Sequence, residues 1–296
     1  MPELPEVETI RRGLNKYIIH KKIIRTDILC EKSFIGKPEE GVVQGLRRFG
    51  KALIIDLDNH MSLMIHLRMT GQLIFDPSPK EKNTRFAAGH PSDNFTDNLP
   101  NKQTRVVLEF DDGSHLYFND QRKFGFIKTL PTSEVENDSF IKKLAKEPWQ
   151  MTSEEFYKKL SKHPRSNIKA TILDQAIICG LGNIYADEAL FLSRIHPERK
   201  CDSITKKEAD LLLKSAREVM DKSINSGGST MKTYVKADGT KGDYLELFAN
   251  VFRRDGKPCP RCKTEIKKIK VAGRGTHICP NCQKLKATPK TRRGND

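Results

Sequence analysis

Residues 259–282 have the sequence CPRCKTEIKKIKVAGRGTHICPNC, in which two Cys-x-x-Cys pairs stand sixteen residues apart. Two thiolates from each of two tight turns complete a tetrahedral shell around one Zn²⁺ ion. Lysine and arginine side chains in the same stretch favour the thiolate form of cysteine. We therefore predict one structural zinc, held by Cys259, Cys262, Cys279 and Cys282. Four cysteine ligands leave no open coordination position for water.

The residues between the two pairs predict the fold around this zinc. Ile266–Val271 and Thr276–Ile278 alternate as strands do, on either side of Gly273-Arg274-Gly275. We expect a two-stranded zinc ribbon with Arg274 at its tip. An arginine on a rigid hairpin suits contact with a phosphate or a nucleic-acid groove, although a plain exposed turn residue would give the same sequence.

The charge of the chain indicates a polyanionic partner. The net charge is +15, from 53 Lys and Arg against 38 Asp and Glu. From Val251 to Asp296 there are 14 basic and 3 acidic residues, so most of the excess lies in the last sixth of the chain. Nucleic acid is the usual partner of so basic a protein. We therefore expect the basic ribbon to contact it.

Several classes of protein are excluded by composition. No apolar run reaches the roughly 18 residues that a membrane span needs, and charged residues interrupt the N-terminus where a signal peptide would be apolar. The three cysteines outside the pairs are Cys30, Cys179 and Cys201, and we expect them to be small core residues. An odd cysteine count argues against a disulfide framework. We expect a soluble intracellular protein.

Short apolar runs dominate the first 130 residues. Residues 3–18 have apolar positions at helical spacing and predict one amphipathic helix. Many short β-type runs with frequent turns predict a sandwich or barrel, and residues 76–103 are expected to form a long polar surface loop. The expected strands are Lys22–Leu29, Val42–Arg48, Ala52–Leu57, Ser62–Leu67, Gln72–Phe75, Arg105–Phe110, His115–Phe118 and Phe126–Leu130.

The second half changes to helical patterns. Thr152 and Thr205 each stand three residues before a glutamate, which is the capping-box spacing. We expect a mostly α domain after a boundary near residues 131–150, followed by an irregular segment at 230–250. The expected helices cover roughly residues 152–162, 166–177, 183–194 and 205–225.

The N-terminus offers an unusual nucleophile. The chain opens Met1-Pro2-Glu3-Leu4-Pro5-Glu6, and removal of the initiator methionine would leave Pro2 with a free secondary amine. An α-amino group titrates near pH ~8, so part of it is neutral and can form an imine with a sugar aldehyde. Proline and glutamate are equally typical of a plain helix start.

Two further motifs suit DNA. Gly180-Leu181-Gly182-Asn183 opens a helix, where free backbone amides and the Asn183 side chain would attract a phosphate. An arginine with apolar neighbours, here Arg122, Phe124 and Met69, can fill the gap that an everted base leaves in a duplex. From spacing alone, a structural turn and core packing explain these residues as well.

Together these motifs resemble those of the bacterial formamidopyrimidine-DNA glycosylases, the Fpg/MutM family. The resemblance runs nearly end to end and in family order. The stretches that carry it are Pro2–Glu8, Arg47–Lys51, His66–Gly71, Asp120–Gly125, Gly180–Tyr185, Ile195–Pro197 and Val271–Thr276.

The resemblance implies a bifunctional DNA glycosylase and AP lyase that excises oxidised purines, such as 8-oxoguanine and formamidopyrimidines, from duplex DNA. Pro2 would attack C1′ of the damaged nucleotide, and Glu3 would be the general acid/base. Lys51 would assist β-elimination and contact DNA. Arg274 would serve δ-elimination and phosphate binding, while Glu6 would lie near the flipped base.

The resemblance also implies the DNA contacts. Lys169 and Asn183 match phosphate-contacting positions, and Met69, Arg122 and Phe124 match the triad that fills the void in the helix. The fold implied is α+β: an N-terminal β-sandwich with an N-terminal helix, then a helix-two-turns-helix domain and the zinc ribbon. The domains expected are 1–132 (catalytic), 133–150 (linker), 151–250 (helical), 251–285 (zinc finger) and 286–296 (basic tail).

Some features depart from the family or stay open. A family histidine contact near Gln103 is missing, and Arg105 is a candidate to replace it. Residues 229–243 lie where the family closes a cover over the base, but they align loosely. Two rivals remain: an endonuclease VIII-like glycosylase for oxidised pyrimidines, and a non-catalytic zinc-ribbon DNA-binding protein. We expect a monomer in the bacterial cytoplasm, associated with the nucleoid and with damaged double-stranded DNA.

Overall fold

The computed structural model describes residues 1–78, 85–89, 98–227, 231–235, 241–242 and 247–285, without side-chain description for 231–242. The chain divides into two compact units. The first comprises Met1–Leu144 and Met220–Phe248, and the second comprises Ala145–Val219 and the segment that begins at Ala249. Among the described residues, no helix has the length and apolar character needed to cross a membrane.

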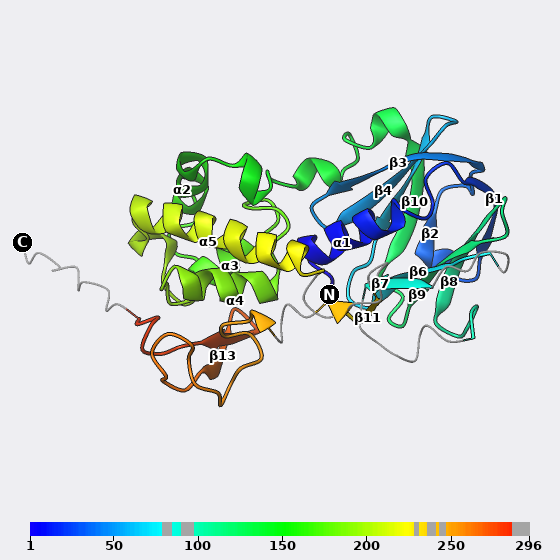
Figure 1. Ribbon diagram of the computed structural model, residues 1–296. Coiled ribbons are helices and arrows are strands. Elements are labelled where there is room, and N and C mark those ends of the chain that lie inside the picture. Colours follow the sequence, from blue (N-terminus) through cyan, green and yellow to red (C-terminus); the bar gives the residue numbers. More distant parts are fainter. Residues whose placement is uncertain (79–84, 90–97, 228–230, 236–240, 243–246, 286–296) are drawn as a thin grey trace, which may run out of the picture. The chain divides into compact units, whose positions relative to one another are not determined.

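The first unit is built on a ten-stranded sheet with the order β2-β10-β5-β4-β3-β1-β8-β9-β6-β7 (Figure 1). β3 pairs with β4 along its length but with β1 only at its first residues, so the strands form two five-stranded halves. The strands are β1 (Lys22–Ile28), β2 (Phe34–Ile35), β3 (Gly41–Phe49), β4 (Ala52–Leu57), β5 (Met61–His66), β6 (Gly71–Asp76), β7 (Phe86–Gly89), β8 (Thr104–Phe110), β9 (His115–Asp120) and β10 (Phe126–Pro131).

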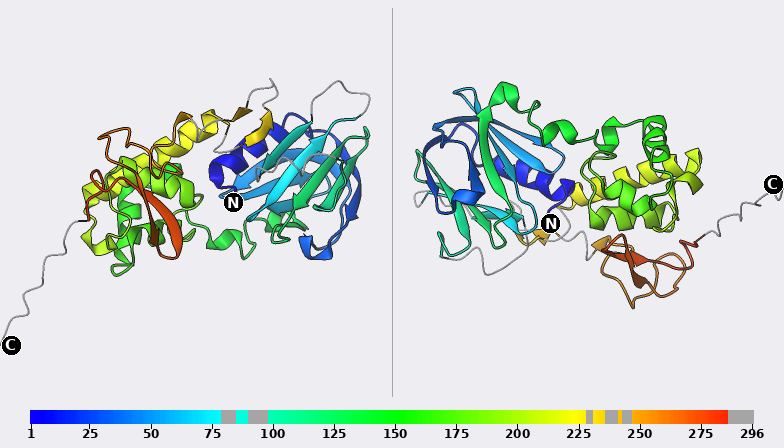
Figure 2. Two further views of the ribbon diagram at one scale, coloured as in Figure 1. Left: turned by 90° about the horizontal axis from the view of Figure 1, so that it is seen from below. Right: turned by 180° about the vertical axis from the view of Figure 1, so that it is seen from behind.

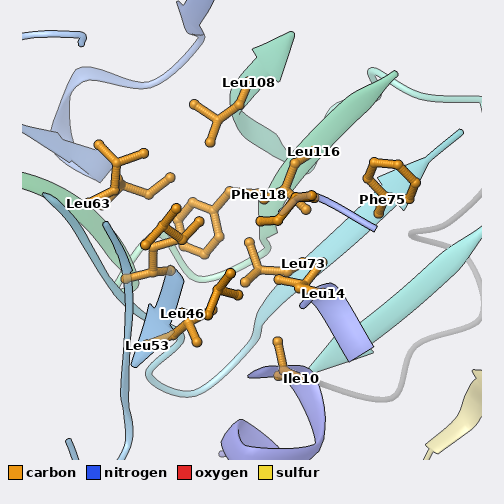
Figure 3. Packing of buried hydrophobic residues seen from close by; sticks show 14 of the residues in the cluster. Ile10, Leu14, Leu46, Leu53, Leu63, Leu73, Phe75, Leu108, Leu116 and Phe118 are labelled. Carbon is orange, nitrogen blue, oxygen red and sulfur yellow. The ribbon is translucent and has the colours of Figure 1, made fainter. Parts of the chain in front are cut away.

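The two halves enclose the main hydrophobic core, which helix α1 (Leu4–Leu14) completes (Figure 3). Leu53 and Leu63 come from one half and Leu73 and Leu108 from the other, and all four are buried in one cluster. Ile10 is one of the α1 residues that pack into it. The predicted N-terminal β-sandwich with an N-terminal helix is confirmed, although the helix ends at Leu14 rather than at residue 18.

A second apolar layer explains why β4 is apolar without alternation. Its other face, at Ala52 and Ile54, packs against Val135 and Ile141. Those two residues lie in the stretch expected to be a linker, and this part of the chain contains the 3₁₀ helices η3 (Thr132–Glu134), η4 (Ile141–Lys143) and η5 (Pro148–Gln150). The first unit therefore extends to Leu144.

Part of the expected surface loop at 76–103 is a strand. β7 pairs with β6 in antiparallel register from Gln72↔Gly89 to Phe75↔Phe86. The ring of Phe86 is 2% exposed, and a short apolar run suffices to add an edge strand when its side chains reach the core. Residues 79–84 and 90–97 of this loop lie outside the described residues.

The second unit is helical, as predicted. It contains α2 (Ser153–Ser161), α3 (Ile168–Leu173), α4 (Asn183–Leu192) and most of α5 (Lys206–Asn225), within which the chain returns to the first unit. Both predicted capping boxes form: Glu155 N donates to Thr152 Oγ1, and Glu208 N donates to Thr205 Oγ1, each at 3.2 Å. The segment expected to be irregular contains the short strands β11 (Met231–Val235) and β12 (Lys241–Gly242). The whole of the expected base cover at 229–243 lies outside the residues whose side chains are described.

The zinc ribbon consists of β13 (Lys267–Val271) and β14 (Arg274–Ile278), drawn in orange and red in Figure 2. One detail of the sequence prediction is wrong. Val271 pairs with Arg274, so the tip is Ala272-Gly273, both with positive φ (48° and 76°), and Arg274 is the first residue of β14. A two-residue turn with positive φ at both positions fits the right-handed twist of a hairpin.

Candidate functional site

The start of α1 places the predicted nucleophile. Glu3 is the N-cap of the helix, and its backbone N–H donates to Glu6 Oε2 at 2.8 Å. Pro2, immediately before the cap, is buried, and Glu3 and Glu6 are 3% and 4% exposed. The helix-start and chemical interpretations of this sequence are therefore compatible, because the cap itself fixes Pro2 and Glu3. While Met1 is attached, the Pro2 nitrogen is an amide and cannot act as a nucleophile.

Lys51 is positioned by a turn that is tied to the same helix. Gly50 and Lys51 join β3 to β4, and Gly50 takes a left-handed conformation with φ of 56°. The Arg48 guanidinium donates to Gly50 O at 3.0 Å and to Glu8 Oε2 at 3.1 Å. Glu8 belongs to α1, so one arginine links the helix that begins beside Pro2 to the turn that carries Lys51. Lys51 is only 7% exposed.

Glu8 is held as a carboxylate. Burial alone would raise its pKa, but hydrogen bonds from Arg11, Arg12 and Arg48 outweigh burial and lower the pKa to about 2. The link between α1 and the β3–β4 turn is therefore fully charged at neutral pH.

His66 is a residue of this region to which the sequence analysis gave no role. Burial, with the positive charges of Arg68 and Lys51, lowers its pKa to about 3, so the ring is neutral. Its Nδ1 accepts the backbone N–H of Arg68 at 3.0 Å, which leaves the proton on Nε2. The motif containing His66 was visible in sequence, but the hydrogen bond that fixes the tautomer was not.

Met69, Arg122 and Phe124 are exposed, unlike ordinary core residues. Met69 is 39% and Phe124 55% exposed, and the Arg122 guanidinium lies over the Phe124 ring at 4.8 Å from its centroid. Both segments belong to the first unit. Their exposure favours the void-filling interpretation over the core interpretation, although their role remains a prediction.

Arg105 does not offer a free guanidinium for DNA. It is 8% exposed and donates to Asp120 O at 2.7 Å and to Lys102 O at 3.1 Å. The structure therefore disfavours Arg105 as the replacement for the family's histidine contact, because its donors fix the loop before β8.

Two polar residues of the second unit, Asn183 and Arg274, lie at the start of β14. Asn183, the first residue of α4, donates from Nδ2 to Gly275 O at 3.0 Å. The side chain of Arg274, the preceding residue, is exposed. The turn at Gly180–Asn183 thus packs against the ribbon, and Asn183 and Arg274, two of the three residues expected to contact phosphates, lie at this junction.

The ammonium of Lys169 lies inside the second unit and not at its surface. Its side chain is 0% exposed, and Nζ lies 2.6 Å from Asp187 Oδ1 and 2.7 Å from Thr276 Oγ1. Since its ammonium contacts α4 and β14 inside the unit, it fixes the ribbon to the helices. This placement disfavours direct phosphate contact by Lys169 and favours a supporting role at the junction of α4 and β14.

The four paired cysteines converge as predicted. One ligand atom of each lies within 4.8 Å of the others. Burial and the neighbouring thiols raise the pKa of Cys282 to about 12, whereas hydrogen bonds from Thr264 and Asn281 lower that of Cys262 to about 5. A divalent cation removes this conflict by stabilising all four thiolates. The donor set fits one structural zinc. Cys179 and Cys201 are buried core residues, as expected, and Cys30 is half-buried.

Comparison with known proteins agrees with this architecture. Three family models match successive parts of the chain: the formamidopyrimidine-DNA glycosylase N-terminal domain over residues 1–127, the formamidopyrimidine-DNA glycosylase H2TH domain over 144–235, and a zinc finger found in FPG and IleRS over 256–285. The fold and the four-cysteine site thus define a zinc-containing DNA glycosylase of base-excision repair.

Individual relatives and solved structures identify the family of the chain. A formamidopyrimidine-DNA glycosylase from Pelotomaculum thermopropionicum is 38% identical, over 97% of this chain and 100% of its own length. A Lactococcus lactis FPG mutant in complex with Fapy-dG-containing DNA has a TM-score of 0.83 at 34% identity, and a MutM structure with carbocyclic 8-oxo-G-containing DNA has 0.81 at 33%. Each covers 96% of this chain and 100% of the other. The chain belongs to the formamidopyrimidine-DNA glycosylase family.

Proposed function

We propose that this protein is a bifunctional DNA glycosylase and AP lyase that excises oxidised purines through a Schiff base on Pro2. The observation that carries the proposal is the buried Pro2-Glu3 step at the cap of α1, in a chain that matches the family throughout. The Fapy-dG and 8-oxo-G in the DNA of two similar structures support oxidised purines as the substrate class.

The chemistry begins once Met1 is removed. The Pro2 nitrogen attacks C1′, the bond from C1′ to the damaged base breaks, and the base leaves with the bonding electrons. Glu3 protonates the ring oxygen O4′, so the sugar opens and an iminium forms between C1′ and the proline nitrogen. A secondary amine gives an iminium with a permanent positive charge, which acidifies the C2′ proton.

Strand cleavage follows from that acidity. Loss of the C2′ proton expels the 3′-phosphate by β-elimination, and a second elimination expels the 5′-phosphate. We propose that Lys51, on the turn that Arg48 ties to α1, assists the first elimination. Arg274 on the ribbon binds the phosphate that leaves in the second elimination. Water then hydrolyses the iminium, which releases the unsaturated sugar aldehyde, returns Pro2 to the free amine and leaves a one-nucleotide gap in the duplex.

The remaining residues hold the DNA. We propose that Asn183, with Arg274, contacts phosphates, that Met69, Arg122 and Phe124 fill the void left by the everted nucleotide, and that Glu6 lies near the base. The structural zinc fixes the ribbon and supplies no chemistry. We also propose that the protein acts as a monomer in the bacterial cytoplasm, at the nucleoid.

The proposal is tested by single-turnover cleavage of matched duplexes containing 8-oxoguanine, formamidopyrimidine or thymine glycol. We expect the purine lesions to be cleaved faster, with both β- and δ-elimination products. Glu3→Gln should lose at least about 100-fold in rate, the range of general acid/base catalysis. Glu40→Gln removes an exposed carboxylate of the same unit and should leave the rate unchanged.

The rival functions give different results. A preference for thymine glycol would identify an endonuclease VIII-like specificity. DNA binding without cleavage of any substrate, by protein that lacks Met1, would leave a non-catalytic DNA-binding protein and contradict the proposal.

A further inference from the structure

One buried carboxylate organises both segments that carry the exposed void-filling side chains. Asp120, the last residue of β9, is 0% exposed. Its Oδ2 accepts the backbone N–H groups of Phe124 at 2.8 Å and Gly125 at 2.7 Å, and its Oδ1 accepts that of Arg122 at 3.1 Å. A carboxylate that accepts several backbone N–H groups fixes the loop that donates them.

The same carboxylate reaches the neighbouring strand. The Thr70 hydroxyl donates to Asp120 Oδ1 and accepts the Arg122 backbone N–H at 3.0 Å. Thr70 immediately follows Met69, and the next residue, Gly71, pairs with Asp120 at the start of β6. The segments around Met69 and Arg122 are thus joined through one hydroxyl and one carboxylate.

The backbone of the segment 121–125, between β9 and β10, is restricted in conformation. Lys123 takes a left-handed conformation with φ of 56°, which is uncommon for a residue with a side chain. A Cβ on Gly125 would lie 2.7 Å from the Phe118 ring and 3.2 Å from Asp120 Oδ2. Strained backbone of this kind persists only where surrounding contacts determine it, and here Asp120 makes those contacts.

We propose that Asp120, acting through Thr70, is a positioning residue for base eversion: it holds Met69, Arg122 and Phe124 in one rigid group before DNA binds. The inference rests on the proposed function, since it assigns a cause to the placement of the void-filling side chains. Side chains fixed in advance lose less conformational freedom on binding. The benefit is confined to the step in which a base leaves the stack.

The test compares two duplexes that differ only opposite the lesion. In one, 8-oxoguanine faces cytosine; in the other it faces a tetrahydrofuran abasic analogue, so there is no partner base to separate or support. The free-energy cost of eversion is lowest when the base is unpaired. Asp120→Ala should therefore lose about tenfold or more in single-turnover excision from the paired duplex. On the unpaired duplex it should stay within about threefold of the wild type.

Thr70 provides a milder variant that avoids a collapsed loop. Thr70→Val removes the hydroxyl at similar volume and should show the same selective loss, whereas Thr70→Ser should restore excision from the paired duplex. Arg122→Ala should show the same selective loss of excision from the paired duplex. The double variant Asp120→Ala, Arg122→Ala should excise no more slowly than the slower single variant, because both substitutions act on one step. Asp56→Asn is the matched control: Asp56 also accepts a hydroxyl, from Ser62 at 2.6 Å, in the same unit.

Each outcome decides one question. Equal losses on both duplexes for Asp120→Ala and Thr70→Val, or additive losses with Arg122→Ala, would overturn the positioning role. If Asp120→Ala does not fold, Thr70→Val alone gives the result. Failure of the wild type to excise 8-oxoguanine from either duplex would instead refute the proposed function.

Discussion

The buried pair Lys169–Asp187 should dominate the stability of the second unit. Both side chains are 0% exposed, with Nζ 2.6 Å from Oδ1. Asp187 Oδ2 also accepts the backbone N–H of His277 at 2.9 Å. Lys169→Met preserves the apolar stem but leaves the Asp187 charge buried, with only the His277 backbone N–H and, at 3.4 Å, the His277 Nδ1 beside it. Breaking a buried pair in this way costs about 3–5 kcal/mol.

Removing both charges should cost much less. Lys169→Met with Asp187→Asn leaves an amide oxygen for the His277 N–H and no buried charge, so we expect a loss of roughly 1–2 kcal/mol relative to the wild type. The double variant is then more stable than Lys169→Met alone.

Urea unfolding of zinc-loaded protein measures these differences. Trp149 is the only tryptophan and belongs to the second unit, so its fluorescence reports on that unit. Lys214→Met is the matched control, because Lys214 pairs with Asp210 in an exposed i,i+4 pair with side chains 65% and 34% exposed. It should cost less than about 0.5 kcal/mol. Equal costs for Lys169→Met and Lys214→Met, or additive costs in the double variant, would refute the reasoning.

The same variants separate support of the ribbon from phosphate contact. A direct phosphate contact contributes about 0.9 to the slope of log affinity against log salt concentration. We expect the double variant to keep the wild-type slope on damaged duplex. A fall of nearly one would show that Lys169 neutralises a phosphate, as the sequence motif suggested.

Three further predictions concern other parts of the chain. The lowered pKa of Glu8 means that its contribution to the free energy of unfolding, on the order of 3 kcal/mol, is present above pH 4.5 and is lost as the pH falls towards 2. Thermal melts followed by circular dichroism should show Glu8→Gln less stable than the wild type at pH 7, with a difference in Tm that disappears in acid. A difference in Tm that is independent of pH would contradict this. Chelation of zinc, or Cys279→Ser, should abolish binding to damaged duplex while the sheet remains folded by circular dichroism, and unchanged binding would contradict a structural role for the ribbon. Gly13→Ala should lower the free energy of unfolding by about 1–3 kcal/mol despite the better helix propensity of alanine, because the new Cβ would lie 2.3 Å from the Phe86 ring. Adding Phe86→Leu to the same chain should recover part of this loss in stability. A Gly13→Ala variant more stable than the wild type would be inconsistent with this packing.

Spacing in the sequence was sufficient for the zinc ligands and for the two capping boxes. The zinc ligands follow from two Cys-x-x-Cys pairs, and both capping boxes form at Thr152 and Thr205 because the cap depends on residues three apart. Spacing did not separate Met69 and Phe124 from core residues; the family resemblance assigned them to the void-filling group, and both are exposed in the structure.

Tertiary contacts explain what the sequence could not show. The sequence does not distinguish a lysine that binds a phosphate from one that pairs with a buried aspartate, and only the fold brings Asp187 beside Lys169. Because Arg274 lies between two glycines, the sequence did not show which two residues form the hairpin turn; the positive φ values identify them as Ala272 and Gly273. The role of Asp120 depends on backbone amides, which carry no signature in the sequence.

The central claim is that the Pro2 nitrogen forms the covalent intermediate. Borohydride reduction of a reaction with an 8-oxoguanine:cytosine duplex should trap a protein–DNA adduct, and peptide mass mapping should place it on the N-terminal peptide that begins at Pro2. An N-terminally extended chain, whose Pro2 nitrogen is an amide, should give no adduct. An adduct mapped to a lysine such as Lys51, or no adduct from protein that lacks Met1, would contradict the account.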